Sequence, residues 1–238
     1  MRERGNYPGP NAGPKGMVVH FTAGRWEKKL ASALQSIAGG IKDGYTFLCI
    51  ACTGELVQAH NVLKYGYHAG ESAWRVKLKR LPWSIVGSVS DGFIGVEMNN
   101  AGKVDRVVNS KTKQITYKTW FDQTLTEDQV RYVQEKDGRI YNGEFYAWGC
   151  PTGHYHKYSA EQEETLIRTI LWLYVNCEDF KLEYVVGHHE VAGKLGIGYW
   201  RKNDPGGALS MPMEMLRAKL MTEKSELIAK YGIKKEAR

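Results

Sequence analysis

Residues 17–24 read MVVHFTAG, and this short stretch sets the organisation of the chain. The run from Met17 to Phe21 is mostly apolar, which is typical of a buried β-strand, and it ends at the polar Thr22. His20 therefore stands at the end of a predicted strand. A second apolar run, VVGHH at 185–189, predicts another strand that ends at a histidine, His188.

A carboxylate, Asp204, follows the second of these strands in a predicted loop. Neutral imidazoles and carboxylates are the ligands that a catalytic zinc ion prefers, in sets of three with one coordination position left open. A single histidine on an apolar strand, however, is more often a packed core residue than a ligand. The spacing of the residues alone therefore favours a metal site and core packing about equally.

The other predicted elements extend outward from these two strands. Apolar residues three and four apart predict a helix over 25–39 that ends at Gly39-Gly40. Similar patterns predict a hairpin over 46–60, a buried strand over 91–99, a helix over 159–177 and a C-terminal helix over 212–231. Ser159, followed three residues later by Gln162, is a capping signal for the helix over 159–177. Because strands and helices alternate, we expect an α/β fold with a central mixed β-sheet flanked by helices.

The chain divides into three predicted parts. Residues 1–16 are rich in Gly, Pro and Asn and predict an extended arm. Residues 17–222 form the main domain, in which 66–92 predict a surface loop and 100–158 a large insertion or lid. A short helix is predicted after Thr126 within that insertion. Residues 223–238 form a basic C-terminal tail.

The bulk composition limits the function classes. The net charge of the 238 residues is +7, the mean hydropathy is −0.45, and no apolar run approaches the roughly 20 residues of a membrane span. We expect no membrane insertion and no secretory signal, hence synthesis in the cytoplasm. The charge is compatible with a plain soluble surface or with attraction to the anionic bacterial envelope. Nucleic-acid binding is disfavoured, because the basic residues are scattered and no nucleic-acid motif is present.

Four cysteines are present, of which Cys49 and Cys52 are spaced C-x-x-C within an apolar, strand-like run. Residues three apart on a strand point to opposite faces, so this pair is poorly placed to chelate an ion or form a disulfide. We expect small, buried, reduced residues.

Four blocks of sequence resemble the zinc amidase superfamily, which includes phage amidase lysozymes, bacterial anhydromuramyl-peptide amidases and animal peptidoglycan recognition proteins. They are VVHFTAG at 18–24, DGYTFLCIACTGELVQ at 43–58 with YHAG at 67–70, GFIGVEMNN at 92–100, and VVGHHEVA at 185–192 with RKNDPGG at 201–207. Each block alone is weak, but their order along the chain matches that of the family.

The resemblance implies a zinc site made of His20, His188 and Asp204. His189 is the rival for the second position. On an extended segment two neighbours face opposite ways, so only one of them would reach the ion, and the family motif Gly-His favours His188.

The resemblance also implies three catalytic residues: Glu97 as the proton carrier beside the metal-bound water, with Lys202 and Tyr45 stabilising negative charge on oxygen. An acid between Val96 and Met98 would be partly desolvated, which raises its pKa toward values useful in proton transfer. The plain alternatives are a salt-bridged strand residue for Glu97, a solvated charge for Lys202 and a packing residue for Tyr45.

His68 of YHAG matches a family histidine at the substrate groove, and Thr22 is expected to support the site or to contact substrate. His154 and His156 have no counterpart in the family; their H-x-H spacing could bind metal on a strand, but a surface loop is the expected setting. The stretch between His188 and Asp204 is longer than in compact family members, which leaves substrate preference less defined than reaction type.

The family resemblance implies a hydrolase that cuts the amide bond between N-acetylmuramic acid and L-alanine of peptidoglycan, with Zn²⁺ as cofactor and peptidoglycan or muropeptides as substrate. A phage endolysin acting on the host cell wall is the preferred expectation. The alternatives are a cytoplasmic recycling amidase acting on anhydromuropeptides, a peptidoglycan-binding module without activity, and a zinc peptidase that cuts elsewhere in the stem.

Overall fold

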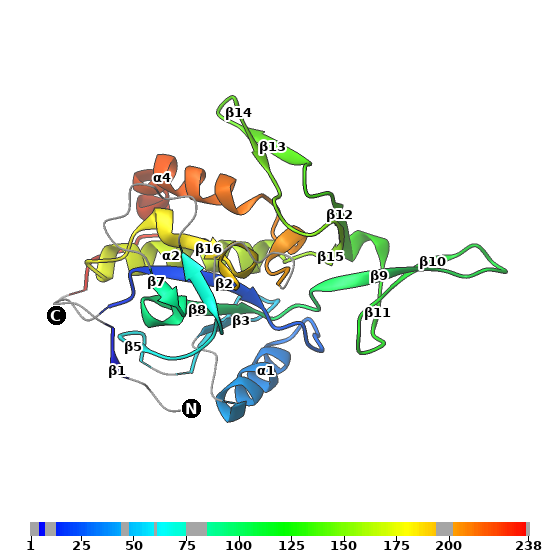
Figure 1. The fold of residues 1–238 in the computed structure, drawn as a ribbon, viewed down its shortest axis with the longest axis horizontal. Coiled ribbons are helices and arrows are strands. Elements are labelled where there is room, and N and C mark those ends of the chain that lie inside the picture. Colours follow the sequence, from blue (N-terminus) through cyan, green and yellow to red (C-terminus); the bar gives the residue numbers. More distant parts are fainter. Residues whose placement is uncertain are drawn as a thin grey trace.

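The computed structural model describes residues 5–7, 13–43, 48–59, 61–74, 85–193 and 202–236. At its centre lies a five-stranded sheet with the strand order β16-β2-β8-β3-β4 (Figure 1). These strands are β16 (Val185–Gly187), β2 (Gly16–Phe21), β8 (Phe93–Met98), β3 (Leu48–Ile50) and β4 (Leu56–Gln58). All neighbours are parallel except β3 and β4, which form an antiparallel hairpin. The predicted mixed sheet is confirmed.

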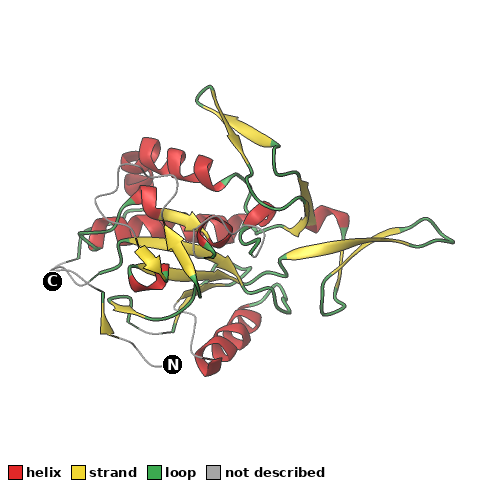
Figure 2. Ribbon diagram, in the orientation of Figure 1, coloured by secondary structure: helices red, strands yellow, loops and turns green. Residues whose placement is uncertain are grey.

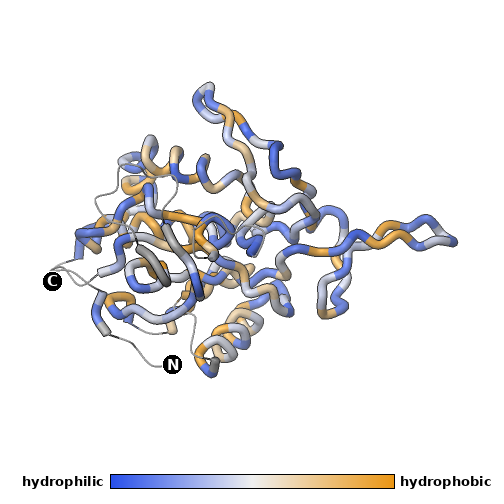
Figure 3. Tube along the Cα trace, viewed as in Figure 1, coloured by the Kyte–Doolittle hydropathy of each residue, from blue (hydrophilic) through white to orange (hydrophobic). Residues whose placement is uncertain are grey.

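Helices cover both faces of this sheet (Figure 2). One face packs on α2 (Ala160–Asn176) and α4 (Met213–Lys230), with Val19 and Val96 of the strands in the same buried cluster as Leu166 and Leu220 of the helices. The other face meets α1 (Leu30–Asp43) at the β3 edge. Because strand residues alternate in direction, His20 and Glu97, which are paired in register, point away from the α2 face. Figure 3 shows the apolar residues concentrated on the central strands and the helices behind them.

The helix predicted over 25–39 differs from α1 at both ends. Residues 25–29 form a loop in which Ser32 Oγ accepts a hydrogen bond from Glu27 N and donates one to Arg25 O. At the other end the helix continues through Gly39 and Gly40 to Asp43. The predicted stop at these glycines is wrong, since glycine in a helix costs only about 1 kcal/mol and Ile41 beyond it packs on the small cluster under α1.

Helix α2 begins as the sequence predicts. Ser159 accepts a hydrogen bond from Gln162 N, and the Gln162 side chain accepts one from Ser159 N. This capping box satisfies two of the free N–H groups in the first turn. Helix α4 also lies where a helix was predicted, and its last two turns take in residues 223–230 of the predicted tail. Residues 231–236 then lie along α2, where Lys234 O and Glu236 N bond to the Asn176 side chain.

The insertion over 100–158 is a β-structure that projects from the body of the protein (Figure 1). It holds a five-stranded sheet of order β11-β10-β9-β15-β12 and a separate β13–β14 hairpin. These strands are β9 (Lys103–Val108), β10 (Ile115–Lys118), β11 (Thr124–Leu125), β12 (Val130–Val133), β13 (Gly138–Tyr141), β14 (Glu144–Ala147) and β15 (Gly153–His156). The short helix predicted after Thr126 is a single 3₁₀ turn, Glu127–Gln129.

Shorter elements complete the fold. β1 (Gly5–Asn6), in the predicted arm, pairs with β5 (Lys64–Tyr65). β6 (Ser72–Trp74) pairs with β7 (Ile85–Gly87), so the predicted surface loop over 66–92 contains a short hairpin. All four cysteines are buried and free, and the burial predicted for Cys49 and Cys52 is confirmed. Within the described ranges, no helix combines the length and apolar character that a membrane crossing requires.

Candidate metal centre

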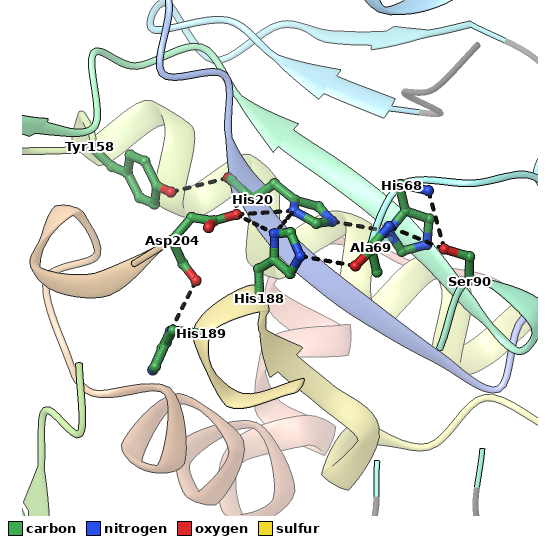
Figure 4. A network of polar contacts seen from close by, with 8 residues as sticks. All are labelled: His20, His68, Ala69, Ser90, Tyr158, His188, His189 and Asp204. Carbon is green, nitrogen blue, oxygen red and sulfur yellow. Dashed lines mark hydrogen bonds and ion pairs between the residues drawn. The ribbon is translucent and has the colours of Figure 1, made fainter. Parts of the chain in front are cut away.

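Three side chains that are distant in the sequence meet at the C-terminal ends of β2 and β16 (Figure 4). His20 Nδ1 lies 3.0 Å from His188 Nδ1 and 3.0 Å from Asp204 Oδ2, and His188 Nδ1 lies 2.9 Å from the same oxygen. All three side chains are buried. They are the one group of three or more potential metal ligands that the described part of the chain brings together.

The outer nitrogens of both imidazoles are held by neighbouring acceptors (Figure 4). His188 Nε2 donates to Ala69 O over 3.2 Å. His68 Nε2 donates to Phe93 O over 2.9 Å, so His68 Nδ1 accepts the proton of His20 Nε2 over 3.0 Å. Since a neutral imidazole carries one N–H, the Nδ1 atoms of His20 and His188 both present lone pairs to the centre.

Three acceptor atoms therefore face one another with no hydrogen between them. Burial and the neighbouring His188 lower the pKa of His20 to about 4, so His20 is neutral at physiological pH. Burial alone would raise the pKa of Asp204, but hydrogen bonds and positive charge from protonated His188 and His20 would hold it well below its ordinary value, so this carboxylate gains from a cation at the centre. Two neutral imidazoles and a carboxylate are a fitting donor set for a divalent cation, which would remove the repulsion between their lone pairs.

The two adjacent histidines both lie in the first turn of a short helix. Strand β16 ends at Gly187, and α3 (His188–Val191) begins directly after it, where an extended segment was expected. The expected geometry is thus wrong, yet the side chains do part: His188 enters the centre, while His189 Nδ1 bonds to the backbone oxygen of Asp204 over 2.9 Å.

Glu97 lies beside His20 in the register of β2 and β8. Its Oε2 is buried without a hydrogen-bond partner among the described residues. Burial, followed by the negative charge of Asp204, raises the pKa of Glu97 to about 8. The expected upward shift is confirmed, and a carboxyl group in this state can hold and transfer a proton near neutral pH.

Lys202 contributes positive charge from the loop before Asp204. Its ammonium lowers the pKa values of both His20 and Glu97, so its field reaches the centre. Tyr45 lies outside the described residues.

Thr22 and His68 both support the loops around the centre. Thr22 Oγ1 donates to Asn100 O and accepts from Asn100 N, which fixes the segment after His20 against the start of the insertion. The His68 ring lies behind His20, with each of its nitrogens in a hydrogen bond to protein. A substrate contact by either residue stays a prediction.

His154 and His156 lie on strand β15, not in the expected surface loop. The His154 ring lies between Tyr117 and Tyr132, and His156 is buried with its Nδ1 accepting a bond from Ala101 N. Residues two apart on a strand share a face, but these two rings have separate protein partners, and neither belongs to the one group of potential metal ligands among the described residues.

Sequence reasoning missed several residues that hold the ligand segments. The Tyr158 hydroxyl donates to the backbone oxygen of His20 (Figure 4). Arg131, on β12 of the insertion, donates to the carbonyls of Gly207, Ala208 and Leu209, just after Asp204. The Trp120 indole N–H donates to Ala23 O, in the loop that follows His20. No local motif signals these contacts, because each joins segments that are far apart in the sequence. The contacts of Arg131 and Trp120 also depend on the fold of the insertion.

An α/β fold that carries a buried centre of two histidines and one carboxylate, beside a protonatable glutamate, is the arrangement of a metal-dependent hydrolase. The profile of the N-acetylmuramoyl-L-alanine amidase family matches residues 10–207. The chain belongs to this family, whose enzymes use a metal.

The chain is similar to solved structures of amidases. The N-acetylmuramyl-L-alanine amidase AmiD from E. coli, in complex with anhydro-N-acetylmuramic acid-L-Ala-D-gamma-Glu-L-Lys, is 18% identical with a TM-score of 0.50, covering 92% of this chain and 60% of its own. AmpDh3 from Pseudomonas aeruginosa, in complex with anhydromuramic pentapeptide, is 17% identical with a TM-score of 0.47, covering 86% and 59%. AmpD is 16% identical with a TM-score of 0.45, covering 92% and 94%. The chain thus spans about 60% of the length of the first two, and no curated protein sequence matches it.

Proposed function

We propose that this protein hydrolyses the amide bond between N-acetylmuramic acid and the L-alanine of the peptidoglycan stem, with a zinc ion held by His20, His188 and Asp204. The observation that carries the proposal is the convergence of His20 Nδ1, His188 Nδ1 and Asp204 Oδ2 within about 3 Å of one another. The family match supports the choice of bond.

When bound, the ion would polarise the amide carbonyl and lower the pKa of water at the open coordination position. Other residues of the protein hold the ligand side chains in position. His68 and Ala69 hold the two imidazoles in the tautomers that leave Nδ1 free. Tyr158 fixes the backbone of His20.

Glu97 is the proton carrier of this reaction. It takes a proton from the attacking water as the new carbon–oxygen bond forms, and gives a proton to the alanine nitrogen as the carbon–nitrogen bond breaks. Lys202 lies close enough for its charge to act on Glu97 and is assigned to the developing negative charge on the carbonyl oxygen. Tyr45 is proposed as a second donor there, and Thr22 and His68 as residues lining the groove.

Within this reaction we assign the protein to the wall-degrading amidases of the endolysin type, which act on peptidoglycan in the host cell wall and are bacteriolytic. The net charge of +7 and the projecting insertion support a large anionic substrate over a small fragment. Faster release of stem peptides from intact walls than from soluble anhydromuropeptides would agree with this assignment, and the reverse order would favour a recycling amidase.

Mass analysis of the products released from purified peptidoglycan tests the reaction itself. We expect free stem peptides that begin with L-alanine, and glycan strands that keep their lactyl groups. Chelator-treated protein and the Glu97→Ala variant should release neither. Cleavage within the stem would identify a peptidase, and binding to the wall without any release would identify a recognition module.

A further inference from the structure

The insertion carries a second candidate site, separate from the metal centre. A hollow of about 610 Å³ opens between β12 and the β13–β14 hairpin. Three cationic and three aromatic side chains line it, and we call this site the basic hollow. The six residues are Arg131, Lys136, Arg139, Tyr132, Phe145 and Trp148.

The walls of the hollow are built by fixed backbone contacts. Trp148 N donates to Asp137 O over 2.7 Å, and Gly149 N donates to Glu135 O over 3.0 Å. At Gly138 a Cβ atom would lie 2.0 Å from Tyr146 O, so a close approach of two strands shapes this wall. The cavity therefore belongs to the fold of the insertion.

Positive charge predominates in the hollow. Asp137 is the one carboxylate among its lining residues, against three cations. Arg131 is occupied by the carbonyls of Gly207 to Leu209 and lies over the Trp148 ring. Lys136 and Arg139 are exposed, and neither makes an ion pair with a residue that the structure describes.

Aromatic surface lies next to these two cations. Phe145 is 62% exposed and Tyr132 52% exposed, although large apolar side chains normally gain free energy by leaving water. A cation beside an exposed ring suits a ligand that combines a carboxylate with an apolar or sugar face. A lone inorganic anion would make no use of the rings.

We propose that the basic hollow binds the carboxylate-bearing stem peptides of peptidoglycan and so anchors the protein to the wall. This inference rests on the proposed function, which makes peptidoglycan the substrate. Lys136 and Arg139 pair with stem-peptide carboxylates, while Phe145 and Tyr132 pack against the aliphatic and sugar portions.

The hollow is also continuous with the support of the metal centre. Arg131 lines the hollow and bonds to three consecutive carbonyls, the first of them three residues after Asp204. One structural unit thus presents both sites, so a wall strand held at the hollow stays near the centre that cuts it. Such two-point attachment raises the effective substrate concentration without new contacts at the centre.

Co-sedimentation with purified peptidoglycan stripped of phosphate-bearing polymers tests the proposal. The full chain is used, metal-loaded and with Glu97→Gln to slow turnover, so that binding is measured with little catalysis. Adding Lys136→Gln and Arg139→Gln should raise the Kd roughly tenfold at low ionic strength, as expected for the loss of two exposed ion pairs. The charge-conserving pair Lys136→Arg and Arg139→Lys should retain most of the binding.

The matched control removes the same charge elsewhere. Lys111→Gln with Lys113→Gln, at the exposed tip of the β9–β10 hairpin, should change the Kd less than about twofold. An equal loss of affinity in the two double variants would overturn the proposal and indicate attraction by diffuse charge. An unchanged affinity in both double variants would also overturn it. A loss seen only on walls that keep their phosphate polymers would assign the hollow to those polymers instead. Because the readout is binding, failure of the hollow and failure of the proposed hydrolysis are told apart.

Discussion

His20 is held at both ring nitrogens and at its backbone oxygen. His68 accepts from its Nε2, Asp204 and His188 lie at its Nδ1, and Tyr158 donates to its carbonyl. Metal-binding histidines generally need such an outer partner to fix the tautomer and orientation of the ring. The unusual feature here is that the partner is a second imidazole, itself fixed by the carbonyl of Phe93.

Replacing His68 by alanine should weaken zinc binding by about 10- to 100-fold, because the His20 ring loses the acceptor that sets its tautomer. Competition titration with a chromogenic chelator measures this directly. His154→Ala, which removes an imidazole from the insertion, should leave the affinity unchanged. Equal affinities of the wild-type and His68→Ala proteins would contradict the role given to His68.

Replacing Glu97 by glutamine should lower kcat by about 10²- to 10⁴-fold while the protein still binds one metal ion. The amide keeps the size of the side chain but cannot carry a proton between water and the leaving nitrogen. Stem-peptide release by mass spectrometry, paired with metal analysis of the same sample, separates the two effects. Normal kcat with bound metal would remove Glu97 from the mechanism.

The residues of the centre could be predicted to different degrees. His20, Glu97 and Asp204 stand in motifs that resemble a family, so the sequence indicates them directly. The position of His68 behind His20 could not be predicted, because it depends on Gly95: a Cβ atom there would lie 2.6 Å from the His68 ring. A missing side chain on one strand thus admits a ring from a distant loop.

At the scale of elements, a buried ion pair joins helix α3 to helix α4. Arg217 forms two hydrogen bonds with the Glu190 carboxylate and a third with Val185 O, and Glu190 also accepts from Gly187 N. Burial would raise the pKa of Glu190, but Arg217 lowers it to about 2. The pair fixes the turn from which His188 projects.

Arg217→Met should destabilise the protein by about 3–5 kcal/mol, because it leaves the Glu190 carboxylate buried without a counter-charge. Lys219→Met removes a half-exposed ion pair with Glu223 on the same helix and should cost at most about 1 kcal/mol. Urea denaturation of the two variants gives both values. The double variant Glu190→Gln, Arg217→Met should regain part of the loss. Similar small costs for both single variants would contradict a buried pair.

Elements with a strong local signal were predictable, and those set by tertiary contacts were not. The Ser159 and Gln162 pattern identified the start of α2. The stop at Gly39-Gly40 was wrong because packing of Ile41 on the core outweighs a weak local preference. The short strands of the insertion lack a long apolar face, so their pairing could not be read from their sequence.

At the scale of the whole molecule, four segments spread from residue 16 to residue 187 pair as parallel strands. The alternation of strands and helices along the sequence predicts the class of fold, but not the order of the strands in the sheet. The insertion then closes on the loop after Asp204 through Arg131, so it also supports the centre.

Global stability should depend on pH through Glu97 in metal-free protein. Its folded-state pKa of about 8 lies above the ordinary 4.5, so the folded state keeps a proton that the unfolded state has lost. The contribution is complete below pH 4.5 and is lost as the pH rises to about 8. Relative to Glu97→Gln, the wild-type protein should lose at least about 1 kcal/mol of unfolding free energy between pH 5 and pH 8.5. A constant difference between the two proteins over this range would contradict the shifted pKa.

The most direct test of the central claim is a zinc titration of the full chain by calorimetry, with wild-type protein and the variants His20→Ala, His188→Ala and Asp204→Ala. We expect one tightly bound ion per chain in the wild type, and loss of tight binding in each variant, while His189→Ala retains it. Tight binding that survives all three changes, or a wild-type protein that binds no ion, would contradict the account.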